Sequence, residues 1–419
     1  MTRPRSVSDS TGSAPVLFSG WLTLCFSLMF SGLLVFPSRT GLMNALDAVF
    51  FLPALIYVAV ASRHQPLALL KRHGWLLAFL CYATFSTFFG PAPNPSRFGR
   101  ALIEIFTLFA FVELAVQRYP RAFWGALLIG TGVAAVAALV DFFAYYFIVD
   151  RPFSSQLYGV FEVFEIRPWL VLDTNQLYAS MYCITLPFFA FFASRQLPPG
   201  RLTRLAPYLI TLALLVYLAA NQRRSTLVAL AVGCMALPII TMKRRLLVPL
   251  VAVVLVAAAA LALNPEMITE RGTSQRPQLW SATWEMILEA PVTGHGMANE
   301  TRELHIVVDG EPVVQDHPHN YFLSLLYHIG FLGLGLWVML WAPALWRGWR
   351  RYPQRISVLA AAMATGFSAV LFDGIHPYTP FMYNWPSVWI PMALLVAYVR
   401  QQYALSTTPS SNCVATNRM

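Results

Sequence analysis

Residues 122–148 read AFWGALLIGTGVAAVAALVDFFAYYFI, an apolar block in which Asp141 is the only charged side chain. A helix needs about 20 residues to cross the roughly 30 Å hydrocarbon layer of a bilayer, so this block is long enough to span a membrane. Backbone amides in hydrocarbon must bond within their own segment, which makes such a span helical. The block therefore predicts a transmembrane helix, with lipid as its main solvent.

Blocks of this kind recur along the chain. Hydrophobic residues make up 57% of the 419 residues and charged residues 11%, against roughly 45–50% and 25% in soluble domains. The first block is too long for the apolar part of a signal peptide and lacks a small-residue cleavage site, so we expect it to remain as a helix. About twelve spans are predicted, over residues 16–36, 42–62, 75–90, 99–117, 122–148, 173–194, 205–220, 225–242, 246–263, 320–343, 356–372 and 384–400.

The placement of charge predicts the topology. The formal net charge is +10, but the basic residues lie in short connectors rather than on one stripe, which argues against nucleic acid as a partner. If the N-terminus is cytoplasmic, most lysines and arginines fall on that side, as positive-inside placement requires. The predicted regions are a cytoplasmic tail (1–15), nine spans (16–263), a non-cytoplasmic loop (264–319), three further spans (320–400) and a second cytoplasmic tail (401–419).

The long loop is predicted to contain an amphipathic helix. Pro277 stands in its first turn, and Pro291 with the Gly294-His295-Gly296 turn ends it. Apolar side chains follow between them with a helical period, at Trp280, Thr283, Trp284, Ile287 and Leu288. Because Glu285 and Glu289 lie on the other face, we expect this helix at the membrane interface. The predicted fold class is therefore an all-α integral membrane protein with a large non-cytoplasmic loop that carries an interfacial helix.

The loop re-enters the membrane at His317-Pro318-His319-Asn320. Asn320 can cap the following helix, and Pro318 restricts His317 to an extended conformation, so His319 is held at the mouth of the helix. An imidazole in this position is either structural or a general base.

Two glycines follow on the same helix. In a regular helix Gly330 would lie almost directly beneath His319, with Gly333 about 40° away. Such a face predicts either close helix packing or a groove for a lipid chain.

Arginines mark two other helix starts in the predicted topology. Arg223-Arg224-Ser225 opens the eighth span on the non-cytoplasmic side, and Arg276 opens the interfacial helix. Arg223 and Arg224 either reach lipid phosphates or form an anion site at the helix start. Arg276 is either a solvated charge on a surface helix or a second such site. Together with His319, these arginines predict transfer chemistry on a phosphate-bearing, membrane-bound substrate.

Two further readings of the polar residues were weighed. His317 and His319, with Asp316, His295 and His305, supply enough ligands for zinc, but they follow no H-E-x-x-H spacing, so no metal or other cofactor is predicted. Within the spans, acidic residues could mark a proton or ion path, at Asp47, Glu104 and Asp141.

Several motifs resemble the O-antigen ligase and polymerase superfamily. His319-Asn320, nine residues and then Gly330-x-x-Gly333 match its signature, and Arg224-Ser225 matches a second motif. The R-x-x-x-W, P-x-x-G-x-G and D/N-x-N motifs of the family are matched by Arg276 to Trp280, Pro291 to Gly296, and Asp173 to Asn175. Arg223 departs from the pattern, because family members often have serine there.

The resemblance implies a metal-independent glycosyltransferase of the bacterial inner membrane that faces the periplasm. The donor would be a polysaccharide on undecaprenyl pyrophosphate, and the acceptor a sugar hydroxyl of lipid A-core. His319 would take the acceptor proton, while Arg224 and Arg276 would bind the pyrophosphate. Other residues would contact substrate, namely Arg223, His317, Asn320, Asp173, Asn175, Gly330 and Gly333. The alternatives are an O-antigen polymerase of the same superfamily and, from another class, a membrane transporter or flippase.

Overall fold

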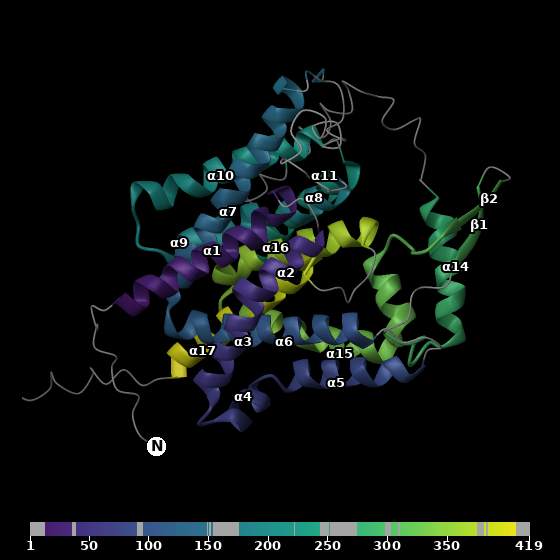
Figure 1. Ribbon diagram of the computed structural model, residues 1–419, viewed down its shortest axis with the longest axis horizontal. Helices are drawn as coiled ribbons and strands as arrows, with labels where there is room; N and C mark the ends of the chain where they lie inside the picture. The colour runs from purple at the N-terminus through teal and green to yellow at the C-terminus, as the bar shows by residue number, and fades with distance from the viewer. Residues whose placement is uncertain are drawn as a thin grey trace, which may run out of the picture.

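The protein is a bundle of helices with one small hairpin (Figure 1). A computed structural model describes residues 13–35, 39–89, 95–148, 150, 152–153, 176–221, 223–243, 251, 275–297, 303–308, 311–374, 381–382 and 384–407. The α-helices are α1 (Ser13–Val35), α2 (Arg39–Leu46), α3 (Leu52–Ser62), α4 (Pro66–Arg72), α5 (Gly74–Ser86), α6 (Pro95–Arg118), α7 (Pro120–Phe143), α8 (Gln176–Cys183), α9 (Leu186–Gln196), α10 (Arg201–Ala220), α11 (Arg224–Thr241), α14 (Arg276–Glu289), α15 (Tyr321–Arg351), α16 (Pro353–Asp373) and α17 (Ile390–Thr407). Short π or 3-10 turns lie at Asp47–Phe51, Thr87–Phe89, Ala144–Ile148 and Trp385–Trp389, and the antiparallel strands are β1 (Leu304–Val308) and β2 (Glu311–Gln315).

Several helices match the predicted spans. Among the described residues, 7 helices are long and apolar enough to cross a membrane, and Gly74–Phe89 forms a shorter apolar helix. These helices confirm a multi-pass, largely helical membrane protein, while the number of twelve spans stays a prediction. The expected span over residues 246–263 lies outside the described residues apart from position 251.

The structure corrects three details of the predicted fold. The expected span at 173–194 is interrupted at residues 184 and 185, next to Pro187, which has no amide proton to continue the helix. The expected helix at 320–343 extends to Arg351 and contains a break. The loop includes a β-hairpin, which an all-α prediction misses; it pairs Leu304 with Gln315.

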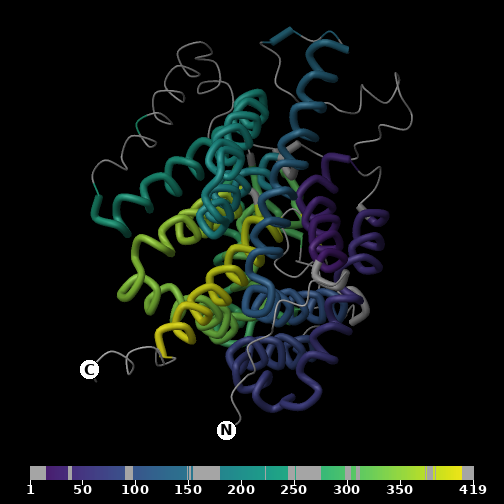
Figure 2. The backbone as a smooth tube through the Cα atoms, turned by 90° about the vertical axis from the view of Figure 1, so that its left-hand side faces the viewer, coloured from purple at the N-terminus to yellow at the C-terminus, as the bar shows by residue number. Residues whose placement is uncertain are grey.

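Helix α17 occupies the centre of the bundle. Every residue from Ile390 to Val399 is buried, as expected of a helix that is apolar all round and surrounded by other helices. Figure 2 shows α17, in yellow, between the teal helices on one side and the purple and blue helices on the other.

Contacts among α4, α6, α15 and α17 define one end of the bundle, called the α4 end below. Arg400 near the end of α17 donates to the backbone carbonyl of Arg72 at 2.6 Å and to the carboxylate of Glu113, which lies near the end of α6. Arg347 in the last turns of α15 lines one cavity with Arg72 and Arg400. Because Tyr119 connects the end of α6 directly to α7, helix α7 starts at the α4 end.

Helices α7 and α10 both run away from the α4 end. A Cβ placed on Gly132 of α7 would lie 3.7 Å from Ile210, and farther along α7 Asp141 lies beside Tyr217. Positions later in α7 therefore face positions later in α10, so the two helices are parallel. The end of α10 consequently lies at the opposite end of the bundle.

That opposite end is called the α14 end, because α14 and the hairpin lie there. Helix α11 starts there with Arg224, directly after α10. Helix α15 also starts there with Tyr321, since its last turns lie at the α4 end. In Figure 1, α14 and the hairpin lie together at the right-hand edge, whereas the start of α1 and the end of α17 lie toward the left.

The break in α15 is filled by the backbone of the segment Pro291–Met297. In an unbroken helix the amides of Phe331 and Leu332 would donate to the carbonyls of Tyr327 and His328. Instead they donate to Pro291 and Val292, at 2.8 and 3.2 Å. The two carbonyls released in this way accept from the amides of His295 and Gly296, at 2.8 and 2.9 Å. The loop segment thus replaces the missing helical hydrogen bonds one for one.

Glycine is required on both sides of this exchange. Gly330 has φ 60° and ψ −171°, a conformation open essentially only to glycine, and a Cβ there would lie 2.3 Å from the carbonyl oxygen of Val292. Gly294 has φ 71°, and its Cβ would lie 2.4 Å from the carbonyl carbon of His328. The two backbones approach too closely for any side chain.

The expected alignment of His319, Gly330 and Gly333 on one regular helix is therefore wrong. The break at Gly330 changes the direction of α15, and the space beside Gly333 is filled by Ile329, whose Cβ atom lies 2.4 Å from where a Cβ of Gly333 would be. Of the two readings left open for these glycines, the structure favours close packing within the protein.

Substitution of Gly330 by alanine tests this arrangement. We expect Gly330→Ala to destabilise the protein by at least about 1–2 kcal/mol, because the left-handed conformation alone costs that much for an L-residue. Gly335→Ala is the matched control, since Gly335 lies in the same helix with no atom within 4 Å of its Cβ position. Thermal unfolding of the purified protein in detergent measures both variants, and equal midpoints for the two would contradict the role of the break.

Candidate functional site

The structure confirms that Asn320 caps α15. Its side-chain oxygen accepts hydrogen bonds from the amides of Phe322 at 3.0 Å and Leu323 at 3.1 Å. His319, directly before the cap, has φ 50°, a left-handed value that is uncommon outside glycine, although histidine adopts it more often than most residues. Strain of this kind persists only where the surroundings enforce it, and it is frequent at functional sites.

His319 lies against a second histidine. The ring centroids of His317 and His319 are 4.0 Å apart. On its other side, Nδ1 of His317 contacts the carboxylate of Asp316. Asp316, His317 and His319 are therefore joined by two successive side-chain contacts, from the carboxylate to the first imidazole and from that ring to the second.

Trp280 connects α14 to this histidine segment. Its indole N–H donates to the carbonyl of Pro318 at 3.1 Å, and its ring packs against Phe372 at the end of α16, with centroids 6.3 Å apart. Arg276, four residues earlier, lies one turn away on the same face of α14. The structure thus brings the start of α14 and the histidine segment together.

The predicted amphipathic helix exists as α14, and protein covers part of its apolar surface. The buried residues are Leu279, Thr283 and Ile287, whereas Trp284 and Leu288 are 41% and 56% exposed. Leu279 packs on the hairpin and Ile287 packs on α15, so α14 is held by protein on that face. The prediction placed the apolar residues on one face at the membrane interface; it did not include the hairpin, which covers Leu279.

Arg224 lies at the same level of the bundle as the cap of α15. A Cβ on Gly233 of α11 would meet Thr365 of α16, and the two helices run in opposite directions. Arg224 is nine residues before Gly233, and Gly374 is nine residues after Thr365, so the two positions lie level. A Cβ on Gly374 would lie 2.6 Å from Cβ of Tyr321, which directly follows Asn320. With only α16 between α11 and α15, Arg224 lies roughly 16–20 Å from Tyr321, backbone to backbone.

Of the other predicted site residues, the two arginines before and at the start of α11 are described by the structure, and two polar residues are not. Arg223 precedes α11 in an extended conformation, and both arginines are partly buried. Nη2 of Arg224 is buried without a hydrogen-bond partner among the described residues. Asp173 and Asn175 lie outside the described residues.

Two of the acids within the predicted spans take part in a network at the start of α6. Arg100 binds Asp47 at 2.8 Å and Glu104 at 2.9 Å. The second oxygen of Glu104 accepts from the amide of Phe381 at 2.8 Å. Asp47 and Glu104 thus join three segments, which is a structural role. Asp141 is buried beside Tyr217.

Sequence reasoning missed two residues of this region. The Tyr82 hydroxyl donates to the carbonyls of Thr293 at 3.2 Å and Ile329 at 3.1 Å, so it holds the loop segment against the break in α15. No local pattern could reveal a contact between residues more than 200 positions apart. Asp316 was named only as a possible metal ligand, although its place next to His317 could have suggested the pairing.

Within the described part of the chain, no group of three or more His, Cys, Asp or Glu side chains is placed to hold a metal ion.

The fold and the site define a multi-pass membrane protein with histidine and arginine side chains at one end of its bundle. Residues 209–338 match the sequence model of the family described as O-Antigen ligase. The chain is also 28% identical over 408 residues to an O-antigen ligase of Pseudomonas aeruginosa, an alignment that covers 93% of this chain and 92% of that protein. The two findings confirm the resemblance to the O-antigen ligase family that the motifs predicted.

The cap at Asn320 offers a test of how His319 is held. We expect Asn320→Ala to speed hydrogen exchange of the Phe322 and Leu323 amides about fivefold, because loss of a cap costs about 1 kcal/mol. Asn320→Asp keeps an oxygen acceptor in the same place and should exchange like the wild type. Mass-spectrometric hydrogen exchange over the start of α15 measures both variants. The same exchange rate in the alanine variant and the wild type would contradict the cap.

Proposed function

We propose that this protein is an O-antigen ligase. It transfers a polysaccharide from undecaprenyl pyrophosphate to a sugar hydroxyl of lipid A-core, on the periplasmic side of the bacterial inner membrane. The family match, the similarity over most of the chain and the multi-pass fold support the assignment. In this orientation the α14 end is periplasmic and both termini are cytoplasmic, in keeping with positive-inside placement of the charges.

One observation carries the proposed mechanism: Arg224 and His319 lie at the same end of the bundle and at the same level. The Trp280 contact adds the start of α14, with Arg276, to that end. A substrate that bears both a pyrophosphate and a reacting sugar needs cationic groups and a base within its own length. The position of these three helix starts at one end of the bundle supports the proposal.

The reaction forms one bond and breaks one. The acceptor hydroxyl oxygen attacks the anomeric carbon of the donor, and the bond from that carbon to the pyrophosphate oxygen breaks. The hydroxyl proton passes to His319, and undecaprenyl pyrophosphate leaves with the bonding electrons. An alcohol is too weak an acid to ionise in advance, so a base placed for proton transfer in the transition state is required. Attack opposite the leaving group predicts inversion at the anomeric carbon.

The arginines bind the leaving group. Negative charge grows on the pyrophosphate as the glycosidic bond breaks, and fixed donors aimed at that charge stabilise the transition state. Arg224 offers a guanidinium with a buried N–H that lacks a partner among the described residues, at the positive dipole end of a helix start. Arg276 has the corresponding place on α14, and Arg223 and Asn320 lie next to these groups in sequence. The reaction proposed here uses no metal.

The neighbours of His319 act on its position. The left-handed backbone of His319 and the cap at Asn320 fix the backbone position from which the His319 side chain extends. The neighbouring His317 ring limits the rotamers that the His319 ring can adopt. Asp316 holds the His317 ring in turn. Gly330 and Gly333 contribute through packing, and Asp173 and Asn175 stay predicted substrate contacts.

Replacement of His319 tests the base. We expect His319→Ala to lose transfer by at least about 100-fold, the lower range for a general base. In cells that lack the gene, this variant should leave full-length polymer on the carrier lipid and bare core on the lipopolysaccharide. His305→Ala is the matched control, because His305 is an exposed imidazole of the hairpin, and it should complement fully. Full complementation by His319→Ala would overturn the base assignment, and single repeat units on the core would indicate a polymerase.

Replacement of Arg224 tests the pyrophosphate site. We expect Arg224→Gln to lower kcat roughly 100-fold to 1000-fold, as removal of one transition-state donor does. Arg224→Lys should recover part of the activity, because it keeps the charge but loses the planar fork. Arg204→Gln, in the first turn of α10 at the other end of the bundle, is the control.

The assay uses purified protein, lipid-linked donor and lipid A-core acceptor, with and without EDTA. Wild-type activity in Arg224→Gln would contradict the pyrophosphate role. Abolition of wild-type transfer by EDTA, with recovery on addition of a divalent ion, would contradict the metal-free mechanism.

A further inference from the structure

A cavity at the α4 end lies far from the proposed chemistry. It has a volume of about 280 Å³ and lies between α5, α15 and α17. Arg347 on its wall is 17 residues beyond the break at Gly330, which corresponds to roughly 25 Å of continuous helix. The cavity therefore belongs to neither the donor site nor the acceptor site.

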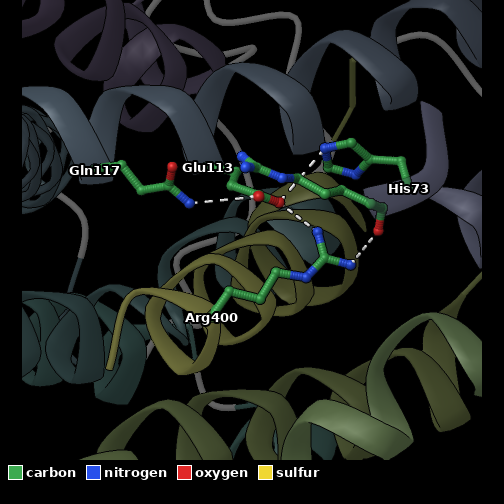
Figure 3. Close-up of polar contacts among 5 residues, drawn as sticks. His73, Glu113, Gln117 and Arg400 are labelled. Carbon is green, nitrogen blue, oxygen red and sulfur yellow. Dashed lines mark hydrogen bonds and ion pairs between the residues drawn. The ribbon is translucent and has the colours of Figure 1, made fainter. Parts of the chain in front are cut away.

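Three arginines line the cavity, namely Arg72, Arg347 and Arg400. Figure 3 shows Arg400 directed at Glu113, with His73 on the other side of the same carboxylate. Glu113 thus neutralises Arg400. Arg72 and Arg347 form no ion pair among the residues that the structure describes, so they leave two positive charges at the cavity.

His73 adds no charge at neutral pH. Burial lowers the pKa of His73 to about 4, although the nearby Glu113 carboxylate acts in the opposite direction. The imidazole lies 3.4 Å from Glu113 and is neutral at pH 7. The excess charge of the cavity is therefore that of arginines and does not change near neutral pH.

The rest of the wall is apolar and open to the side. Trp75 and Met339 line the cavity and are 55% and 41% exposed, so they face the surroundings of the bundle as well. Trp346 and Trp349, on either side of Arg347, are also exposed. Tryptophan concentrates where acyl chains meet headgroups, which places the cavity at the level of the lipid headgroups.

We propose that this cavity binds the headgroup phosphate of an anionic phospholipid from the membrane leaflet at the α4 end. Arg72 and Arg347 bind the phosphate, and the apolar wall takes the first part of an acyl chain. The volume is slightly below the roughly 300–1,000 Å³ of sites that enclose a whole small molecule, so most of the lipid stays in the bilayer. Basic pockets between membrane helices select anionic headgroups in this way.

Native mass spectrometry of the purified full chain tests the proposal. The probes are dioleoyl phosphatidylglycerol, dioleoyl phosphatidylcholine and inorganic phosphate, each added to delipidated protein in a neutral detergent. We expect one phosphatidylglycerol to bind in preference to phosphatidylcholine. The double variant Arg72→Gln/Arg347→Gln should bind it roughly thirtyfold more weakly, as expected when two arginines near an anionic headgroup are lost.

Two further variants locate the site. Arg350→Gln is the matched control, because its guanidinium stacks on Trp346 at 4.5 Å outside the cavity, and it should bind like the wild type. Ala344→Phe fills the cavity without a change of charge and should also lose the bound lipid.

Three results would overturn the proposal. The first is equal binding of the two lipids by the wild-type protein. The second is phosphatidylglycerol binding as strong as that of the wild type in the double variant or in Ala344→Phe. The third is displacement of the lipid by equimolar inorganic phosphate. None of these measurements uses the transfer reaction, so the outcome is independent of the proposed ligase activity.

Discussion

The exchange of backbone hydrogen bonds between the break in α15 and the segment Pro291–Met297 is the constraint on which the α14 end depends. A backbone carbonyl or amide left without a partner in a buried position costs several kcal/mol in hydrocarbon, so a helix can break there only if another segment takes over its hydrogen bonds. The loop segment supplies two donors and two acceptors, and Tyr82 holds both backbones from outside. The exchange fixes the end of α14 against α15. Trp280 then fixes the start of α14 against the histidine segment.

The low dielectric constant inside a helix bundle explains why its carboxylates are paired with arginines. A carboxylate among apolar helices is costly unless it is paired. Asp47 and Glu104 share Arg100, and Glu113 contacts Arg400, so these acids join helices that are distant in sequence. These ion pairs give Asp47, Glu104 and Glu113 a structural role, whereas Asp141 lies buried beside Tyr217. Arg224 at one end and Arg72 and Arg347 at the other have no carboxylate partner in the part of the chain that the structure describes, and we assign anion binding to them.

The two proposed phosphate sites, one at each end of the bundle, differ in their surroundings. At the α14 end a guanidinium is combined with a helix start and an imidazole, which suits a leaving group whose charge grows during a reaction. At the α4 end guanidinium groups are combined with an apolar wall at headgroup level, which suits a ligand whose charge is constant. A lipid held at the α4 end would contact α15 and α17, the helices that extend toward the other end, and so would stabilise the frame that carries the site.

The sequence by itself determined the features that depend on local chemistry and on solvent. Apolar length predicted the membrane helices, Asn320 predicted the cap, and the Pro-Gly pattern predicted the end of α14, because each follows from residues a few positions apart. Only the tertiary structure decided the break at Gly330, the buried face of α14, the hairpin and the pairing of Glu104 with the amide of Phe381. These features depend on contacts between segments as far apart as Tyr82 and Ile329, and a periodic pattern within one helix carries no information about which distant backbone will fill a gap in it. The common end shared by Arg224 and His319 has the same origin, since it follows from the order and direction of packed helices.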